Sequence, residues 1–287
     1  ESVFELAQLS ELCRKRGKPC RISFRFNPDI DAGTHPYIST GLAQHKFGLD
    51  TVAVEAASEI LRDNPLIKLV GIGSHIGSQV LDVQPYMDAF EKVIQLAEKL
   101  RSMGHAIDHV DLGGGFGIPY REEGVPDFDT LAAFLAKRCS DCRIVMEPGR
   151  FIVGKAGILL TSILGAKTNH DKSFYIVDGG MNDLIRPALY NAYHNVLPVS
   201  KGGSSEIIAD VVGPVCESSD FFAKERTLPE LLPGELLAVM DTGAYGFVAS
   251  SNYNSRPKVA EVLVDNSSFH IIRSRETWED MIRHEET

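Results

Sequence analysis

The chain has 287 residues, 44% of them hydrophobic and 24% charged, which is typical of a globular protein with one large or two ordinary domains. Its net charge of −10 argues against a nucleic acid as a partner, and no apolar run is long enough to span a membrane. The five cysteines are odd in number and sparse, which predicts reduced thiols and a cytoplasmic location.

Cys139 and Cys142 form a single CxxC motif. No second pair stands at the spacing of a zinc site, so we expect no metal. A redox role is the weaker interpretation of this motif. The stronger one is two free thiols at the junction between a helix and a strand.

The first half of the chain alternates helix-like and strand-like segments. Ser2 and Glu5 form a capping box that predicts a helix at the start, so we expect a chain that begins in mid-fold. Strands are then expected at 21–26, 69–74, 109–112 and 144–146, and helices at 50–61, 85–101 and 129–138. This alternation predicts a parallel sheet with right-handed crossovers.

Unusual residues follow the strands of this region at one end, namely Asn27, His75, Gly113 to Gly115 and Glu147. In a (β/α)8 barrel that end is the active-site face. A complete barrel takes about 250 residues and eight strands. The sequence therefore predicts that residues 1–153 form the C-terminal half of a (β/α)8 TIM-type barrel.

The pattern changes after residue 153 to β-branched or alternating runs separated by turn residues. These runs occupy 157–168, 173–178, 206–212, 236–240 and 259–264, with a Gly- and Ser-rich loop at 201–205. Thr277 then caps a short terminal helix. Residues 154–287 are therefore expected to form an antiparallel β domain with a short terminal helix.

Three glycines, Gly113 to Gly115, follow one predicted strand. Consecutive glycine N–H groups can point at a single anion, and no acidic residue follows at the distance of a ribose contact. A single phosphate therefore fits better than a dinucleotide. The alternative is a tight turn between strand and helix.

His75 and Glu147 follow two other predicted strands. A lone histidine is by default a core residue, but His75 is followed by Gly77 and Ser78, which suit a flat ring with a phosphate nearby. A carboxylate beside a pyridine nitrogen keeps that nitrogen protonated, and a pyridinium accepts electrons from a carbanion. Together these residues predict pyridoxal 5′-phosphate as the cofactor.

Six motifs in order, HIGSQ, DLGGGFG, EPGRF, DLIRPALY, GPVCESSD and GAYG, resemble the diaminopimelate decarboxylase family. Its members are fold-type III pyridoxal-phosphate enzymes with a barrel and a β domain, and the resemblance covers essentially the whole chain. It implies a carboxy-lyase that converts meso-2,6-diaminopimelate to L-lysine and carbon dioxide, the last step of lysine biosynthesis. It also implies a homodimer with active sites shared across the interface.

The resemblance also implies the roles of individual residues. The cofactor-binding positions are His75, Ser78, Gly114, Gly115, Glu147, Pro148, Gly149, Arg150 and Tyr245. The substrate-binding positions are Arg150, Arg186, Tyr190, Glu217 and Tyr245. Glu217 would read the distal ammonium of the substrate. Cys216 would donate a proton to the carbanion in the site of the partner subunit.

Simpler interpretations stay open for several of these residues. Cys216 could be a buried thiol, and Arg186 and Tyr190 could be ordinary surface residues. Tyr253 lies near Tyr245 and could be confused with it.

The family's Schiff-base lysine lies upstream of the first residue in the resemblance. Lys46, Lys155 and Lys167 stand at other positions, so we expect the chain as given to lack activity on its own. Two other functions remain: a related decarboxylase of ornithine, arginine or carboxynorspermidine, and a non-catalytic decarboxylase-like protein that binds and regulates a partner. The distal-carboxylate site argues against ornithine and arginine.

Overall fold

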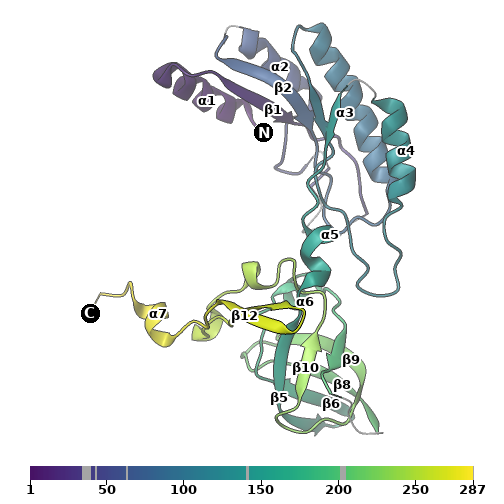
Figure 1. Cartoon of the computed structure of the whole chain (residues 1–287), viewed down its shortest axis with the longest axis vertical. Helices are drawn as coiled ribbons and strands as arrows, with labels where there is room; N and C mark the ends of the chain where they lie inside the picture. Colours follow the sequence, from purple (N-terminus) through teal and green to yellow (C-terminus); the bar gives the residue numbers. More distant parts are fainter. Residues whose placement is uncertain (34–39, 43, 63, 140–141, 201–204, 287) are drawn as a thin grey trace. The chain divides into compact units, whose positions relative to one another are not determined.

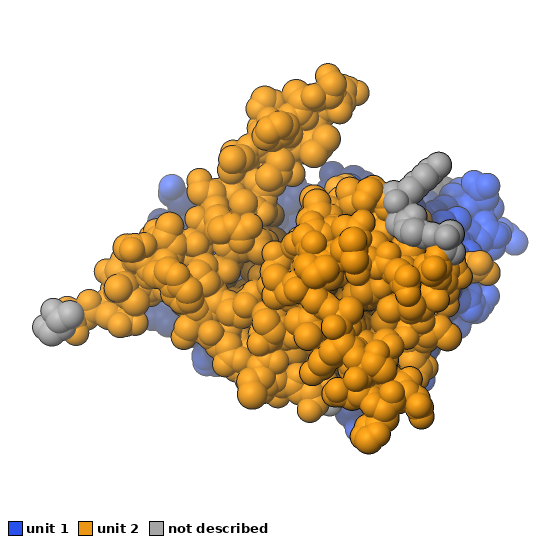
Figure 2. Space-filling view, turned by 90° about the horizontal axis from the view of Figure 1, so that it is seen from below, with its two compact units in different colours: residues 1–119, 123–152 blue, residues 120–122, 153–287 orange. Residues whose placement is uncertain are grey.

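The chain folds into two units, one of residues 1–119 and 123–152 and the other of residues 120–122 and 153–287 (Figure 2). The structure is a computed structural model that describes residues 1–33, 40–42, 44–62, 64–139, 142–200 and 205–286 (Figure 1). Most of the loop predicted at 201–205 therefore lies outside the described residues. None of the helices in the described ranges has the length and apolar character that a membrane crossing requires.

The first unit is built on a parallel sheet whose strands pair in chain order. The strands are β1 (Cys20–Arg25), β2 (Ile67–Gly73), β3 (His109–Asp111) and β4 (Arg143–Val145). The helices are α1 (Val3–Arg16), α2 (Thr51–Arg62), α3 (Gln84–Ser102) and α4 (Phe128–Arg138). Every strand and helix predicted before residue 147 is present, and the pairing of the strands is parallel as predicted.

Helix boundaries in this unit follow local capping chemistry. The Ser2 hydroxyl accepts the N–H of Glu5 at 3.0 Å, and α1 ends at Gly17, whose φ of 61° is left-handed. The Asp50 carboxylate accepts the N–H of Ala53 at 2.7 Å where α2 begins. Because these contacts span only three residues, the sequence pattern identifies them directly.

The apolar core of the first unit lies between the helices and the sheet. Alternate strand residues point into it, among them Ile72 and Val110, which have no exposed surface. Val54 of α2 and Leu100 of α3 are equally buried on the helix side. Burying a side chain of this size stabilises the fold by about 1.5–3 kcal/mol.

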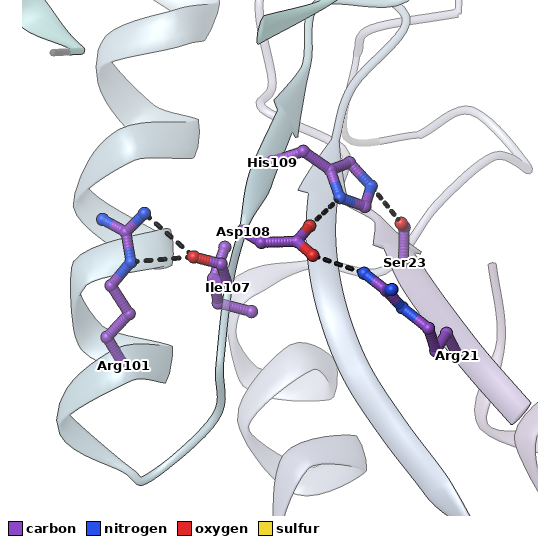
Figure 3. Close-up of polar contacts among 6 residues, drawn as sticks. All are labelled: Arg21, Ser23, Arg101, Ile107, Asp108 and His109. Atoms are coloured by element: carbon purple, nitrogen blue, oxygen red, sulfur yellow. Dashed lines mark hydrogen bonds and ion pairs between the residues drawn. The ribbon is translucent and has the colours of Figure 1, made fainter. Parts of the chain in front are cut away.

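The opposite face of the sheet carries a polar cluster (Figure 3). Arg21 of β1 pairs with Asp108, which contacts Nδ1 of His109 at 2.5 Å, and Nε2 of His109 lies 2.8 Å from the Ser23 hydroxyl. This cluster reaches from β1 to β3 across β2. It can do so because β2 has Gly71 at the crossing point, where a Cβ would lie 2.1 Å from His109 Nε2.

The second unit contains a six-stranded sheet in the order β7-β10-β5-β6-β8-β9. Its strands are β5 (Leu159–Asn169), β6 (Lys172–Val177), β7 (Val196–Pro198), β8 (Glu206–Val212), β9 (Phe221–Pro229) and β10 (Leu236–Val239). Neighbouring strands are antiparallel except β6 and β8, which are parallel. The prediction of an antiparallel domain is wrong for that pair, because the chain forms α6 (Arg186–Tyr190) and β7 at the far edge before it returns to β8.

Short elements complete the chain. They are α5 (Arg150–Val153), the 3-10 helices at Gly154–Ala156, Phe247–Ala249 and Tyr253–Ser255, the hairpin of β11 (Glu261–Asp265) and β12 (Ser268–Arg273), and α7 (Trp278–Ile282). The predicted cap of the terminal helix is confirmed, because Thr277 and Asp280 form a reciprocal capping box.

The expectation that all cysteines are free thiols is wrong for Cys139 and Cys142, which a disulfide joins. Their Cα atoms lie 5.9 Å apart, within the range that a disulfide spans. Cys13 and Cys20 stay reduced with their Sγ atoms 3.4 Å apart, and burial together with the neighbouring thiol raises the pKa of Cys20 to about 11.

We predict that Gly71→Ala lowers the free energy of unfolding by about 1–3 kcal/mol, because the new methyl group displaces the His109 ring and breaks its two contacts. Urea unfolding measures the change. His109→Ala is the matched background, since removal of the ring makes room for the methyl group. A double-mutant cycle without coupling between the two substitutions would contradict the explanation.

Candidate active site

A cavity of about 500 Å³ lies at the C-terminal ends of β1, β2 and β3 in the first unit. Its lining is Ser23, Phe24, Arg25, Thr40, Phe47, Gly73, Ser74, His75, Asp111, Gly113 and Glu147. Ligands of parallel α/β folds bind at this end of the strands, and the volume falls within the usual range of about 300–1,000 Å³ for ligand sites. Two of the predicted cofactor residues, His75 and Glu147, therefore face one cavity.

His75 follows β2 and is held by contacts with the backbone. The N–H of Gly114 donates to its Nδ1 at 3.1 Å, and the Thr40 hydroxyl donates to its carbonyl at 2.7 Å. Burial, aided by the positive charge of Arg25, lowers the pKa of His75. The ring is therefore neutral near pH 7, and its proton lies on Nε2 because Nδ1 accepts.

The three glycines after β3 are each required by close backbone packing. A Cβ at Gly113, Gly114 or Gly115 would lie 2.3, 2.2 or 2.0 Å from a carbonyl oxygen of a residue that follows β2 or β4. Gly113 and Gly115 also have left-handed φ values of 71° and 90°. Packing alone thus accounts for the glycines, and their contact with a phosphate stays a prediction.

Glu147 directly continues the path of β4. Its N–H donates to the carbonyl of Gly113 at 2.8 Å, which fixes the start of its side chain at the rim of the cavity. Burial and the nearby Asp111 raise the pKa of Glu147, while Arg25 acts in the opposite direction. A cation in the cavity would offset this unfavourable environment for the carboxylate.

Asp111 and Arg25 line the same cavity, although neither is among the site residues predicted from the sequence. Asp111 accepts the N–H of Gly113 at 2.7 Å, so one carboxylate oxygen holds the glycine turn. The sequence pattern that could have identified them is the alternation of side chains along β1 and β3, which places both residues on the polar face of the sheet.

Ser78 and Arg150 are brought together by the structure, although 72 residues separate them. Arg150 is the first residue of α5, is buried, and donates from Nη2 to the Ser78 hydroxyl at 3.0 Å. Pro148 and Gly149 form the bend between β4 and this helix, and the carbonyl of Gly149 accepts the N–H of Ile152 at 3.1 Å. The EPGR motif therefore supplies both a carboxylate and a guanidinium to the first unit.

The other predicted site residues lie in the second unit. Arg186 begins α6 and is only 5% exposed, so its interpretation as an ordinary surface residue is wrong. Tyr190 ends the same helix and is half-buried. Cys216 is an exposed free thiol, which rules out a buried one.

A buried carboxylate shapes the loop that carries Cys216 and Glu217. Asp220 is 4% exposed, and its two oxygens accept the N–H groups of Val215 at 2.6 Å and Met181 at 2.7 Å. Burial raises the pKa of Asp220, and these two hydrogen bonds act in the opposite direction. The carboxylate thereby ties the loop to the segment that follows β6.

Tyr253 and Tyr245 differ in their contacts. The Tyr253 hydroxyl donates to the Glu217 carboxylate, and this contact raises the pKa of Tyr253. Tyr245 has a left-handed φ of 58° and is 47% exposed. Tyr253, the alternative to Tyr245, therefore contacts Glu217, a predicted substrate residue. The role of Tyr245 stays a prediction.

Known families match both units. Residues 1–154 match the pyridoxal binding domain of pyridoxal-dependent decarboxylases, and residues 79–243 match the C-terminal sheet domain of these enzymes. The diaminopimelate decarboxylase of Aquifex aeolicus is 47% identical over 285 residues, which cover 98% of this chain and 68% of that protein. That of Neisseria meningitidis serogroup B is 42% identical, with 99% and 69% covered.

The chain belongs to the diaminopimelate decarboxylase family.

Solved structures agree with this assignment. The crystal structure of the diaminopimelate decarboxylase of Helicobacter pylori complexed with L-lysine superposes with a TM-score of 0.94 at 41% identity, and the match covers 99% of this chain and 71% of that one. The fold is accordingly that of the fold-type III pyridoxal-phosphate decarboxylases.

The cofactor of this family, pyridoxal 5′-phosphate, fits the residues of the first unit. The cavity offers a neutral, flat imidazole in His75 and a carboxylate in Glu147 whose raised pKa a cationic ring nitrogen would lower. Ser78 and Arg150 supply a hydroxyl and a guanidinium of the kind that binds phosphate. In the structure, the Gly114 N–H meets His75, so a phosphate at that N–H requires a change of acceptor.

We predict that Asp220→Asn lowers the free energy of unfolding by about 1–3 kcal/mol, since an amide cannot accept two N–H groups through both of its terminal atoms. Urea unfolding of the variant measures the loss. Asp265→Asn on the exposed hairpin is the matched control and should stay within about 0.5 kcal/mol of the parent protein. Equal effects of the two substitutions would refute the anchoring role of Asp220.

Proposed function

We propose that this chain carries the cofactor site and the substrate-selecting residues of an enzyme that converts meso-2,6-diaminopimelate to L-lysine and carbon dioxide. The observation that carries the proposal is the pairing of neutral His75 with Glu147 in one cavity of a diaminopimelate decarboxylase chain. Buried Arg186, a guanidinium suited to a carboxylate, supports this substrate over a simple diamino acid.

In this proposal the first unit holds the cofactor. His75 would lie against the cofactor ring, and the Glu147 carboxylate would stabilise a proton on the ring nitrogen. Ser78 and the backbone at Gly114 and Gly115 would bind the phosphate, while Pro148 and Gly149 would fix the bend that presents Arg150 beside the cofactor. When bound, pyridoxal 5′-phosphate supplies an electron-accepting ring that stabilises the carbanion left by the loss of carbon dioxide.

Most of the residues that recognise and protonate the substrate belong to the second unit. Arg186 and Tyr190, together with Arg150, hold the carboxylate at the non-reacting end, and Glu217 pairs with the distal ammonium. Cys216 delivers a proton from its Sγ to the reacting carbon in the active site of a partner subunit, and its exposure suits this transfer. Tyr245 contacts both cofactor and substrate.

The architecture that goes with this function is also a proposal. Residues 1–153 are the C-terminal half of a (β/α)8 barrel, and residues 154–287 are the β domain. The enzyme acts as a homodimer with shared active sites in the cytoplasm. The parallel order β1-β2-β3-β4, with the cavity at the C-terminal strand ends, supports the assignment to a barrel.

The test is the release of carbon dioxide by the full-length holoenzyme from meso-2,6-diaminopimelate, ornithine, arginine and carboxynorspermidine. We expect turnover of diaminopimelate, with L-lysine as the product, and negligible turnover of the others. Turnover of ornithine but not of diaminopimelate would overturn the proposal. Tight binding of the cofactor without any turnover would favour the regulatory alternative.

Glu147→Gln should lower kcat on diaminopimelate by about 100-fold or more, because the neutral amide no longer holds the proton on the ring nitrogen. Steady-state kinetics measure the loss, and the far-ultraviolet circular dichroism of the variant serves as the folding control. A kcat within a factor of about three of the parent enzyme would contradict the role of Glu147.

Cofactor binding should also depend on pH through Glu147. Burial raises its pKa above the ordinary 4.5 in the cofactor-free protein, and a cationic ring nitrogen lowers it again. Binding therefore releases a proton, so affinity weakens as the pH falls through the raised pKa and is fully present above it. Fluorescence titration with pyridoxal 5′-phosphate from pH 4 to 8 tests this, and the same slope in Glu147→Gln would refute it.

A further inference from the structure

Arg186 is held on two sides by residues with no role so far. Its guanidinium lies 4.7 Å from the centroid of the Tyr120 ring, and its Nη1 lies 2.7 Å from Nε2 of His194. Arg186 is 5% exposed and His194 is completely buried. These contacts restrict both the plane of the guanidinium and its rotation within that plane.

The direction of the contact between His194 and Arg186 follows from the other ring nitrogen. Nδ1 of His194 lies 2.7 Å from the carbonyl oxygen of Met240, which can only accept, so Nδ1 carries the proton. Nε2 of the neutral ring then has a lone pair and accepts an N–H of Arg186. The Met240 carbonyl, next to the end of β10, therefore sets the tautomer that suits Arg186.

Tyr120 is braced in the same cluster. Its ring packs edge-on against His194, with centroids 5.3 Å apart and an interplanar angle of 74°. The next residue, Arg121, lies 4.4 Å from the centroid of the Tyr193 ring, and Arg226 lies 3.8 Å from the same centroid. Cation–π contacts thus fix residues 120–122 to the second unit.

We propose that His194 and Tyr120 are positioning residues that orient Arg186 toward the carboxylate at the non-reacting end of the substrate. This inference rests on the proposed function. A free arginine side chain samples many rotamers, and part of this freedom is lost when it binds a carboxylate. Holding the guanidinium in place beforehand removes that loss from the binding step.

The inference predicts selective effects on ligands that carry the carboxylate. L-lysine keeps the carboxylate of the non-reacting end, whereas cadaverine has the same chain and both amino groups without it. Loss of the orientation of Arg186 therefore weakens the binding of L-lysine and leaves the binding of cadaverine unchanged. A general loss of structure at the site would weaken the binding of both ligands.

The experiment uses matched pairs of variants in the full-length holoenzyme. His194→Leu removes the acceptor, whereas His194→Gln keeps a carbonyl oxygen within reach of Arg186. Tyr120→Leu removes the aromatic face, whereas Tyr120→Phe keeps it. Calorimetric titration measures the Kd of L-lysine and of cadaverine, and steady-state assays give kcat and KM for diaminopimelate.

We expect His194→Leu and Tyr120→Leu to raise the Kd of L-lysine and the KM of diaminopimelate about 10-fold, equivalent to one lost hydrogen bond to a charged group. The Kd of cadaverine should change less than about two-fold, and the Gln and Phe variants should stay within about three-fold of the parent enzyme. Thermal unfolding checks each variant. If His194→Leu does not fold, the two Tyr120 variants decide the test.

Suppose that the parent enzyme decarboxylates diaminopimelate. If the Leu variants then bind L-lysine and cadaverine equally more weakly, or bind both as tightly as the parent does, this inference alone is overturned. A parent enzyme that neither turns over diaminopimelate nor binds L-lysine more tightly than cadaverine would overturn the proposed function and this inference with it.

Discussion

The close contact of the glycine turn after β3 with its neighbours is the constraint on which the first unit depends. Gly113, Gly114 and Gly115 each face a backbone carbonyl at a distance that leaves no room for a Cβ. Through this contact the turn presents one N–H to His75 and one carbonyl to Glu147. The backbone of the turn therefore holds the imidazole of His75 directly and fixes the main chain from which the Glu147 side chain starts.

Burial of polar and charged groups is a common electrostatic feature of both units. In the first unit it lowers the pKa of His75 and raises that of Glu147, because burial disfavours the charged form of each group. In the second unit the buried Asp220 holds backbone N–H groups and the buried Arg186 contacts a neutral imidazole and an aromatic face. Burying such groups is unfavourable for stability, and groups with perturbed pKa values cluster at functional sites.

Local chemistry explains which elements could be predicted from the sequence. The caps Ser2 and Asp50 contact residues only three positions away, and the spacing of apolar residues is visible within each helix. The helices of the first unit could therefore be predicted from the sequence. β7 was missed because it has three residues and ends in Pro198, and β9 because its charged middle interrupts the alternation. The parallel pairing of β6 with β8 depends on the path of the intervening chain, which no local pattern contains.

The same distinction holds for the candidate site. Residues in motifs, such as His75 and Glu147, could be assigned from their position after strands, whereas His194 and Tyr120 could not, because they meet Arg186 only in the fold. Tyr120 follows the glycine turn by five residues yet packs in the other unit against Arg186 and His194. One short segment therefore connects the turn that contacts His75 and Glu147 to the cluster around Arg186. In the proposed function, a substitution in this segment alters substrate selection without touching either ligand, because its effect passes through the orientation of one guanidinium.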